Sequence, residues 1–258
     1  MDRKVFKQQF TLKHTPDWEC PTCSKGTLKV IPKSFHHHEI KSSRFHDYEH
    51  WDPEYIEYVY STLLECTNPA CKETVASSGV GTVGQYYAYD EHGDPEVEYS
   101  DFFKPRCFEP PLKVLSSPQE TPPSVVLLLE ESFRLLFSSP SAALNQVRIA
   151  TEQLLTELGV KRFDVRGKKR YALSLHARIA LLPAKYAAFT DMIFAIKWLG
   201  NAGSHAPGEN DEITMDDVLD AYEFLDHVLK ELYLPKRIEA LKKKAKAVNK
   251  KRGPVKIK

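Results

Sequence analysis

The sequence predicts an α+β protein in which a small β-rich region, residues 1–115, precedes an all-helical bundle, residues 124–235. Two close cysteine pairs lie among segments rich in aromatic and β-branched residues in the first region. Prolines concentrate between the regions, and helical periodicity of apolar residues runs through the second. We therefore expect two domains joined by a linker, residues 116–123, and followed by a basic tail, residues 236–258.

The composition is that of a globular protein. Of the 258 residues, 42% are hydrophobic and 28% are charged, which is enough for a sizeable core. No apolar run approaches the roughly 20 residues needed to span a bilayer, and the N-terminal segment lacks the apolar stretch of a signal peptide. We therefore expect a cytoplasmic protein that does not enter the membrane. Five cysteines in such a protein favour metal binding or free thiols over disulfides.

The paired cysteines predict a metal site. Cys20 and Cys23 are separated by two residues, and Cys66 and Cys71 by four, with proline in or beside each pair. Four deprotonated sulfurs at tetrahedral geometry suit zinc and leave no open position for a substrate water. We therefore expect a zinc-ribbon-like region with one structural zinc ion. Cys107 lies outside both pairs and is predicted to be a buried free thiol.

The segment between the cysteine pairs is rich in histidine and aromatic residues. Its histidines are His36, His37, His38, His46 and His50. A second metal site is one interpretation, but adjacent histidines on a strand point to opposite faces, which favours strand and loop residues. Residues 55–64 and 84–89 predict two strands. Their aromatic side chains either stack nucleic-acid bases or fill the face of a small sheet, and we favour the second interpretation.

Six prolines lie between Phe103 and Pro123. Proline removes a backbone donor and fixes φ, so this stretch is predicted to form neither a continuous helix nor a central strand. We interpret it as the connection between the domains.

Five helices are expected after the linker. They cover residues 124–137, 140–158, 174–182, 183–199 and 214–233, with a basic loop at 161–170. Ser139 and Thr214 are predicted N-caps, and Gly159 is a predicted C-terminal stop. Arg148 and Glu152, four residues apart, predict an ion pair on one helix. The segment 183–199 is apolar on nearly every side, which predicts a helix buried in the middle of the bundle.

The stretch after this apolar segment is the best place for chemistry. Asn201 and His205 are four residues apart, so a helix that continues past Gly200 would place both side chains on one face. The alternative is that Gly200 and Asn201 form an ordinary helix C-cap and that His205 is a solvated loop residue.

The order of these motifs resembles the prokaryotic family called domain of unknown function 4145. The shared features are the cysteine pairs, the linker ending at Pro123, residues 147–152, the sequence WLGNAGSH at 198–205, and a final LYLP at 232–235. That family looks like a branch of the HEPN superfamily of helical bundles. HEPN domains commonly dimerise, and many are metal-independent ribonucleases of anti-phage, toxin-antitoxin and restriction systems. The resemblance therefore implies an HEPN-like bundle, a homodimer, RNA binding and a role in antiviral defence, with a defence-system protein as a possible partner.

The resemblance also implies a candidate ribonuclease site. Active HEPN members carry an Arg, then an Asn, and a His four residues after the Asn. Asn201 and His205 match this motif, but the Arg position falls on Gly200. The missing guanidinium would have bound the scissile phosphate, so the departure favours binding without catalysis. Lys197 and Arg148 are candidate replacement cations, and in an active enzyme His205 would exchange protons with the ribose 2′-hydroxyl or the leaving oxygen.

Positive charge concentrates at the end of the chain. Residues 236–258 hold eleven basic residues and one acid, a net charge of +10, so residues 1–235 carry −9. Such a segment suits RNA, DNA or an acidic partner, and the alternative is a frayed, solvated tail. The expected nucleic-acid contacts are Lys236, Arg237, Lys242, Lys243, Lys244, Lys246, Lys250, Lys251 and Arg252.

Overall fold

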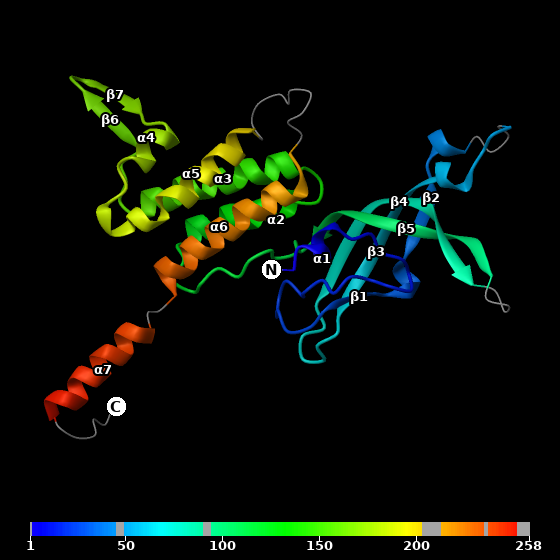
Figure 1. The fold of residues 1–258 in the computed structure, drawn as a ribbon, viewed down its shortest axis with the longest axis horizontal. Helices are drawn as coiled ribbons and strands as arrows, with labels where there is room; N and C mark the ends of the chain where they lie inside the picture. Colours follow the sequence, from blue (N-terminus) through cyan, green and yellow to red (C-terminus); the bar gives the residue numbers. More distant parts are fainter. Residues whose placement is uncertain (1, 45–48, 90–93, 203–212, 235–236, 252–258) are drawn as a thin grey trace.

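The computed structural model describes residues 2–44, 49–89, 94–202, 213–234 and 237–251 (Figure 1). Strands dominate the first part of the chain and helices the second, so the predicted α+β order is confirmed. No helix among the described segments combines the length and the apolar character needed to cross a membrane.

The N-terminal domain is built on one antiparallel sheet of five strands. They are β1 (Leu28–Val30), β2 (His36–Glu39), β3 (Glu57–Cys66), β4 (Thr74–Tyr89) and β5 (Pro95–Glu109). The strand order is β1-β3-β4-β5, and β2 pairs with β3 beyond the end of β1. Short helices lie around the sheet: α1 (Lys4–Lys7), η1 (Pro32–Ser34), η2 (Lys41–Ser43) and η3 (Pro53–Tyr55). The predicted strand at 55–64 corresponds to β3, and that at 84–89 is the end of the longer β4.

Aromatic rings fill the inner face of this sheet. Phe10 lies 5.4 Å from both Trp18 and Tyr60, measured between ring centroids, and Phe35 lies 4.8 Å from Phe103. Trp18 and Phe103 are each only 1% exposed. The interpretation that aromatics pack the sheet is therefore confirmed for this cluster.

Strand β5 corrects the prediction that a linker begins at Phe103. Residues 103–109 are paired with β4, and Pro105 lies opposite Gly79 beside a register shift. An edge strand with a bulge tolerates proline because its missing N–H is not needed for the ladder. A Cβ on Gly79 would lie 2.2 Å from the carbonyl oxygen of Lys104, so the close approach of the strands here requires glycine.

The helical domain follows from Pro123. Its helices are α2 (Pro123–Leu135), α3 (Pro140–Glu157), α4 (Leu175–Ile179), α5 (Thr190–Ala202) and α6 (Met215–Tyr233), and α7 (Arg237–Lys251) follows. The predicted N-caps are confirmed, because the Ser139 hydroxyl accepts from the backbone of Ala142 and Thr214 forms a capping box with Asp217. Gly159 ends α3 with φ of +84°, as expected for a C-terminal glycine.

Two expectations for the helical domain are wrong. The domain is not all-helical, because the basic segment expected to be a loop forms a hairpin of β6 (Phe163–Arg166) and β7 (Lys169–Ala172). Strands of four residues are too short to show periodicity in the sequence. The apolar segment 183–199 is not one buried helix: residues Ala184–Phe189 form the 3₁₀ helix η4, and Trp198 on α5 is 58% exposed.

The two domains share an interface. The ring of Phe137, just after α2, lies 4.9 Å from that of Phe108 on β5. Arg3, at the start of α1, donates to the carboxylates of Asp220 and Glu223 on α6 at 2.6 Å each. The interface therefore combines an apolar contact near the linker with ion pairs to the N-terminal segment.

Candidate functional site

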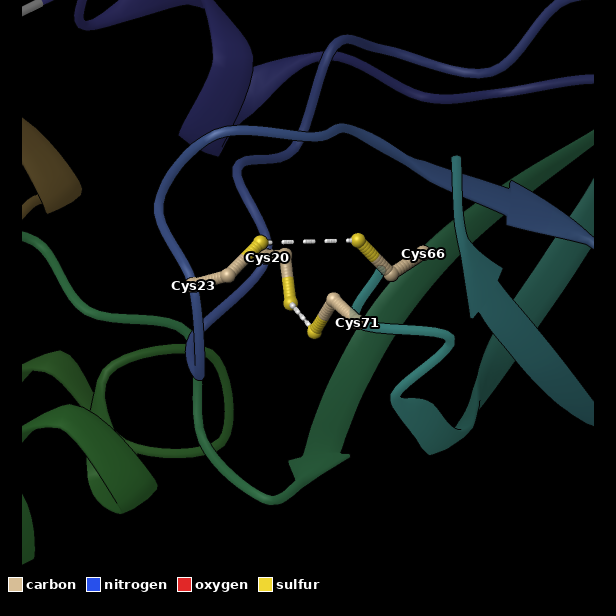
Figure 2. A group of neighbouring side chains, drawn as sticks. All are labelled: Cys20, Cys23, Cys66 and Cys71. Carbon is tan, nitrogen blue, oxygen red and sulfur yellow. Dashed lines mark hydrogen bonds between the residues drawn. The ribbon is translucent and has the colours of Figure 1, made fainter. Parts of the chain in front are cut away.

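The two cysteine pairs meet at one end of the sheet (Figure 2). Cys66 is the last residue of β3, Cys71 lies in the turn before β4, and Cys20 and Cys23 lie in the loop that precedes β1. All four sulfurs lie within 4.8 Å of one another. The Sγ atoms of Cys20 and Cys71 are 3.8 Å apart, and those of Cys23 and Cys66 are 3.7 Å apart. The predicted cluster is therefore present and can hold a metal ion.

The sulfur separations fit tetrahedral coordination. Metal–sulfur bonds of about 2.3 Å at tetrahedral angles place sulfur atoms about 3.8 Å from each other. A disulfide would need a separation of about 2.05 Å, so none of these contacts is a disulfide. Because four thiols surround one point, the arrangement is closed to a substrate.

Backbone turns bring the thiols together. The amide of Cys20 donates to the carbonyl of Gly26, and the amide of Ser24 donates to Cys20, each at 2.9 Å. The amide of Cys71 donates to Asn68 at 2.9 Å in the second turn. Ser24 has a φ of +49°, the left-handed conformation that such tight turns require.

Two residues that the sequence did not single out support the cluster. The backbone N–H of Asn68 lies 3.4 Å from the sulfur of Cys66, and its side-chain amide donates to Cys23 at 3.6 Å. Gly26 lies against the opposite turn, where a Cβ would meet both the sulfur of Cys66 and the nitrogen of Asn68 at 2.7 Å. Groups that hydrogen-bond to metal ligands orient them and tune the metal.

The thiols differ in acidity. A backbone hydrogen bond from Lys25 lowers the pKa of Cys23 to about 6, and Asn68 contributes to the same shift. Burial raises the pKa of Cys66 to about 12, because a thiolate is poorly solvated there. Since the thiolate is the metal ligand, the positive charge of a bound ion would offset the cost of ionising Cys66.

Cys107 and the histidines take no part in this cluster. Cys107 is exposed on β5, so the prediction that it is buried is wrong, because β5 is an edge strand. His36, His37 and His38 form most of β2 and alternate between exposed and half-buried positions. Within the described segments the four cysteines are the only group of three or more possible metal ligands. His46 lies outside those segments.

The candidate ribonuclease residues are partly in view. Helix α5 continues through Asn201 to Ala202, so the expected helix past Gly200 is confirmed. His205 lies outside the described residues. Arg148 on α3 packs its aliphatic stem on α5, since a Cβ on Gly200 would lie 2.8 Å from the Cβ of Arg148. The position of the motif arginine is therefore covered by another arginine.

The two candidate cations are both engaged. The guanidinium of Arg148 forms the predicted ion pair with Glu152, at 2.5 Å, and also donates to Asn145. Lys197 is only 7% exposed, and its Nζ lies 3.1 Å from the centre of the Trp198 ring. Lys197 is therefore held in place, in contrast to the flexible point charge expected from the sequence.

The basic tail is helical over Arg237–Lys251 rather than frayed. Lys244, Lys246, Lys250 and Lys251 are exposed on α7. Arg237, Lys242 and Lys243 belong to the same helix, but their side chains fall outside the described part of the chain, as do Lys236 and Arg252 entirely.

Two family matches divide the chain in the same way as the structure. Residues 130–251 match the domain of unknown function DUF4145, which confirms the family resemblance found in the sequence. Residues 8–108 match a second domain of unknown function, DUF8608, and contain the cysteine cluster. No curated protein and no solved structure matches the chain.

Proposed function

From a chain that joins a DUF8608 domain to a DUF4145 domain, we propose a protein that binds nucleic acid through helix α7 and contains a structural zinc ion. The observation that supports nucleic-acid binding is the separation of charge. Residues 236–258 carry +10 while the remainder carries −9. Cations on an acidic protein are concentrated in this way when they meet a polyanion.

The form of α7 supports the same proposal. The helix extends away from the bundle (Figure 1). Lys246 and Lys250 are four residues apart and share one face, while Lys244 and Lys251 are seven apart and share another. Exposed lysines on a projecting helix reach phosphates without desolvating other side chains, and they release condensed counterions on binding.

The salt dependence of binding tests this proposal. We expect the quadruple variant with Lys244, Lys246, Lys250 and Lys251 changed to Gln to bind RNA and DNA more weakly than wild type. For duplex DNA, loss of four phosphate contacts would reduce the slope of log affinity against log salt by about 3.6. Fluorescence anisotropy with labelled oligonucleotides measures both quantities. An unchanged slope would refute binding through α7 and favour an acidic protein as its partner.

The zinc assignment rests on the donor set. Four soft thiolates at tetrahedral spacing select zinc among abundant cellular metals and exclude hard cations that prefer oxygen. We infer that the ion stabilises the N-terminal domain and takes no part in a reaction. Elemental analysis of the purified protein should find about one zinc per chain.

We also infer that the DUF4145 region is an HEPN-like bundle that forms a homodimer and acts in prokaryotic defence beside a partner protein. The support is the family match at residues 130–251 together with the WLGNAGSH motif. The role of the domain in defence follows from the HEPN resemblance alone.

A metal-independent ribonuclease is the second candidate function. The contact of Arg148 with Gly200 favours it, because a guanidinium from α3 then lies beside the position of the missing motif arginine. Labelled single-stranded RNA should be incubated in EDTA with wild type, His205→Ala and Arg148→Ala protein that retains its zinc. Cleavage lost in both variants would establish the nuclease with Arg148 as the phosphate ligand. Intact RNA with wild type would leave only the binding function.

A further inference from the structure

A second basic surface lies on the β6–β7 hairpin, which projects from the helical domain between α3 and α4 (Figure 1). Its strands pair from Phe163 with Ala172 to Arg166 with Lys169. Gly167 and Lys168 form the two-residue turn, and Gly167 has the φ of +62° that such turns need. All four residues of β7 are exposed.

The hairpin is strongly basic in an acidic part of the chain. Residues 161–171 contain six basic residues and one acid, a net charge of +5, so the rest of residues 1–235 carries −14. The single acid, Asp164, lies 2.9 Å from Lys161 and 3.7 Å from Arg166, and the hydrogen bond from Lys161 lowers the pKa of Asp164. No carboxylate in the described segments pairs with Lys168, Lys169 or Arg170. The tip therefore presents three uncompensated cations.

Ring contacts hold the hairpin in shape. The guanidinium of Arg170 lies 3.7 Å from the centre of the Phe163 ring, and that of Arg166 lies 5.9 Å from the centre of the Tyr171 ring. These cation–π contacts link the two strands across both faces and preorganise the arginines. Val165 is 67% exposed, which packing within the domain does not explain.

We propose that the β6–β7 hairpin inserts into the major groove of duplex DNA. A two-stranded ribbon fits a groove about 12 Å wide, and strands of four residues span about 13 Å, more than the groove depth of about 8.5 Å. Cations at the tip then lie between the two phosphate backbones, and Val165 can contact a thymine methyl group. The major groove of duplex RNA is too deep and narrow for such a ribbon. This inference rests on the proposed nucleic-acid binding and narrows it to DNA.

The test compares two triple variants of the full chain. In the hairpin variant Lys168, Lys169 and Arg170 are changed to Gln. In the matched control Lys33, Lys104 and Lys113, which are exposed on the N-terminal domain or in the linker, are changed to Gln. Circular dichroism checks that both remain folded. Anisotropy is measured with a 20-base-pair DNA duplex, the RNA duplex of the same sequence and single-stranded RNA, across a range of salt concentrations.

We expect the hairpin variant to lose affinity for duplex DNA selectively, with a salt slope smaller by up to about 2.7 for three phosphate contacts. The control should bind like wild type. Wild-type protein should also protect guanine N7, which faces the major groove, from dimethyl sulfate, and the hairpin variant should not.

The inference would be overturned by equal losses for all three probes, by equal losses in the control, or by unchanged DNA binding in the hairpin variant. The α7 quadruple variant separates this outcome from failure of the proposed function. If only the α7 variant loses affinity, the hairpin is not a contact although the protein binds nucleic acid. If wild type binds none of the three probes, nucleic-acid binding itself is refuted.

Discussion

Gly26 offers a test of the metal centre that leaves all four thiols in place. In Gly26→Ala the new Cβ would lie 2.7 Å from the sulfur of Cys66 and 2.7 Å from the nitrogen of Asn68. Ordinary contacts between heavy atoms are about 3.5–4.0 Å, so the two turns must separate by about 1 Å. Metal–ligand distances tolerate deviations of only about 0.2 Å, so a shift of this size disturbs coordination.

The expected loss of zinc affinity follows from the cost of overpacking. Forcing an extra methyl group into a packed site costs about 1–3 kcal/mol. If this cost falls on the bound state, it weakens zinc binding by about 5-fold to 140-fold, since each 1.4 kcal/mol is a factor of ten. Competition with a chromophoric chelator at fixed pH measures the dissociation constant directly.

Gly159→Ala is the matched control. A Cβ on Gly159 meets nothing within 4 Å, but the φ of +84° makes the substitution strained. It should therefore lower stability by about 1 kcal/mol without changing zinc affinity. A dissociation constant for Gly26→Ala within twofold of wild type would refute the packing around Cys66 described above.

Three further predictions follow from other parts of the structure. Replacing Cys66 by Ser should reduce bound zinc from about one per chain to below half, whereas Ser at the exposed Cys107 should leave it unchanged; equal zinc contents by elemental analysis would contradict the four-thiolate site. Replacing Arg178 by Ala should destabilise the protein by about 3 kcal/mol in chemical denaturation, because its buried guanidinium donates to the carbonyl of Glu152 and the hydroxyl of Thr156. The exposed Arg134 should cost under about 1 kcal/mol, and similar losses for both would show that the buried hydrogen bonds contribute little. Light scattering at tens of micromolar should report a homodimer, and a monomer would count against the HEPN-like assembly.

The sequence predicted the features that depend on local chemistry. Helix starts at Ser139 and Thr214 were correct because a capping side chain bonds to amides within three residues. The cysteine cluster was found because thiolate pairs have few other uses in a protein of this composition. Both conclusions need no knowledge of distant parts of the chain.

The features that the sequence missed depend on distant neighbours. Pro105 appeared to exclude a strand, but the edge position of β5 is a property of the whole sheet. Gly26 and Asn68 support the metal cluster across a gap of about forty residues, so spacing alone could not identify them. The role of His205 stays a prediction, because it lies outside the described residues.

The contact between Phe108 and Phe137 limits how this architecture can be recombined. The linker joins two surfaces that already touch, and Arg3 reaches back from the start of the chain to α6. A domain exchanged in from a relative would have to match the aromatic contact and the acidic face of α6 together. Insertions in the linker would separate these surfaces unless the added residues looped out into solvent. The pair of domains is therefore inherited most easily as one unit, with changes tolerated at the two basic projections rather than at the junction.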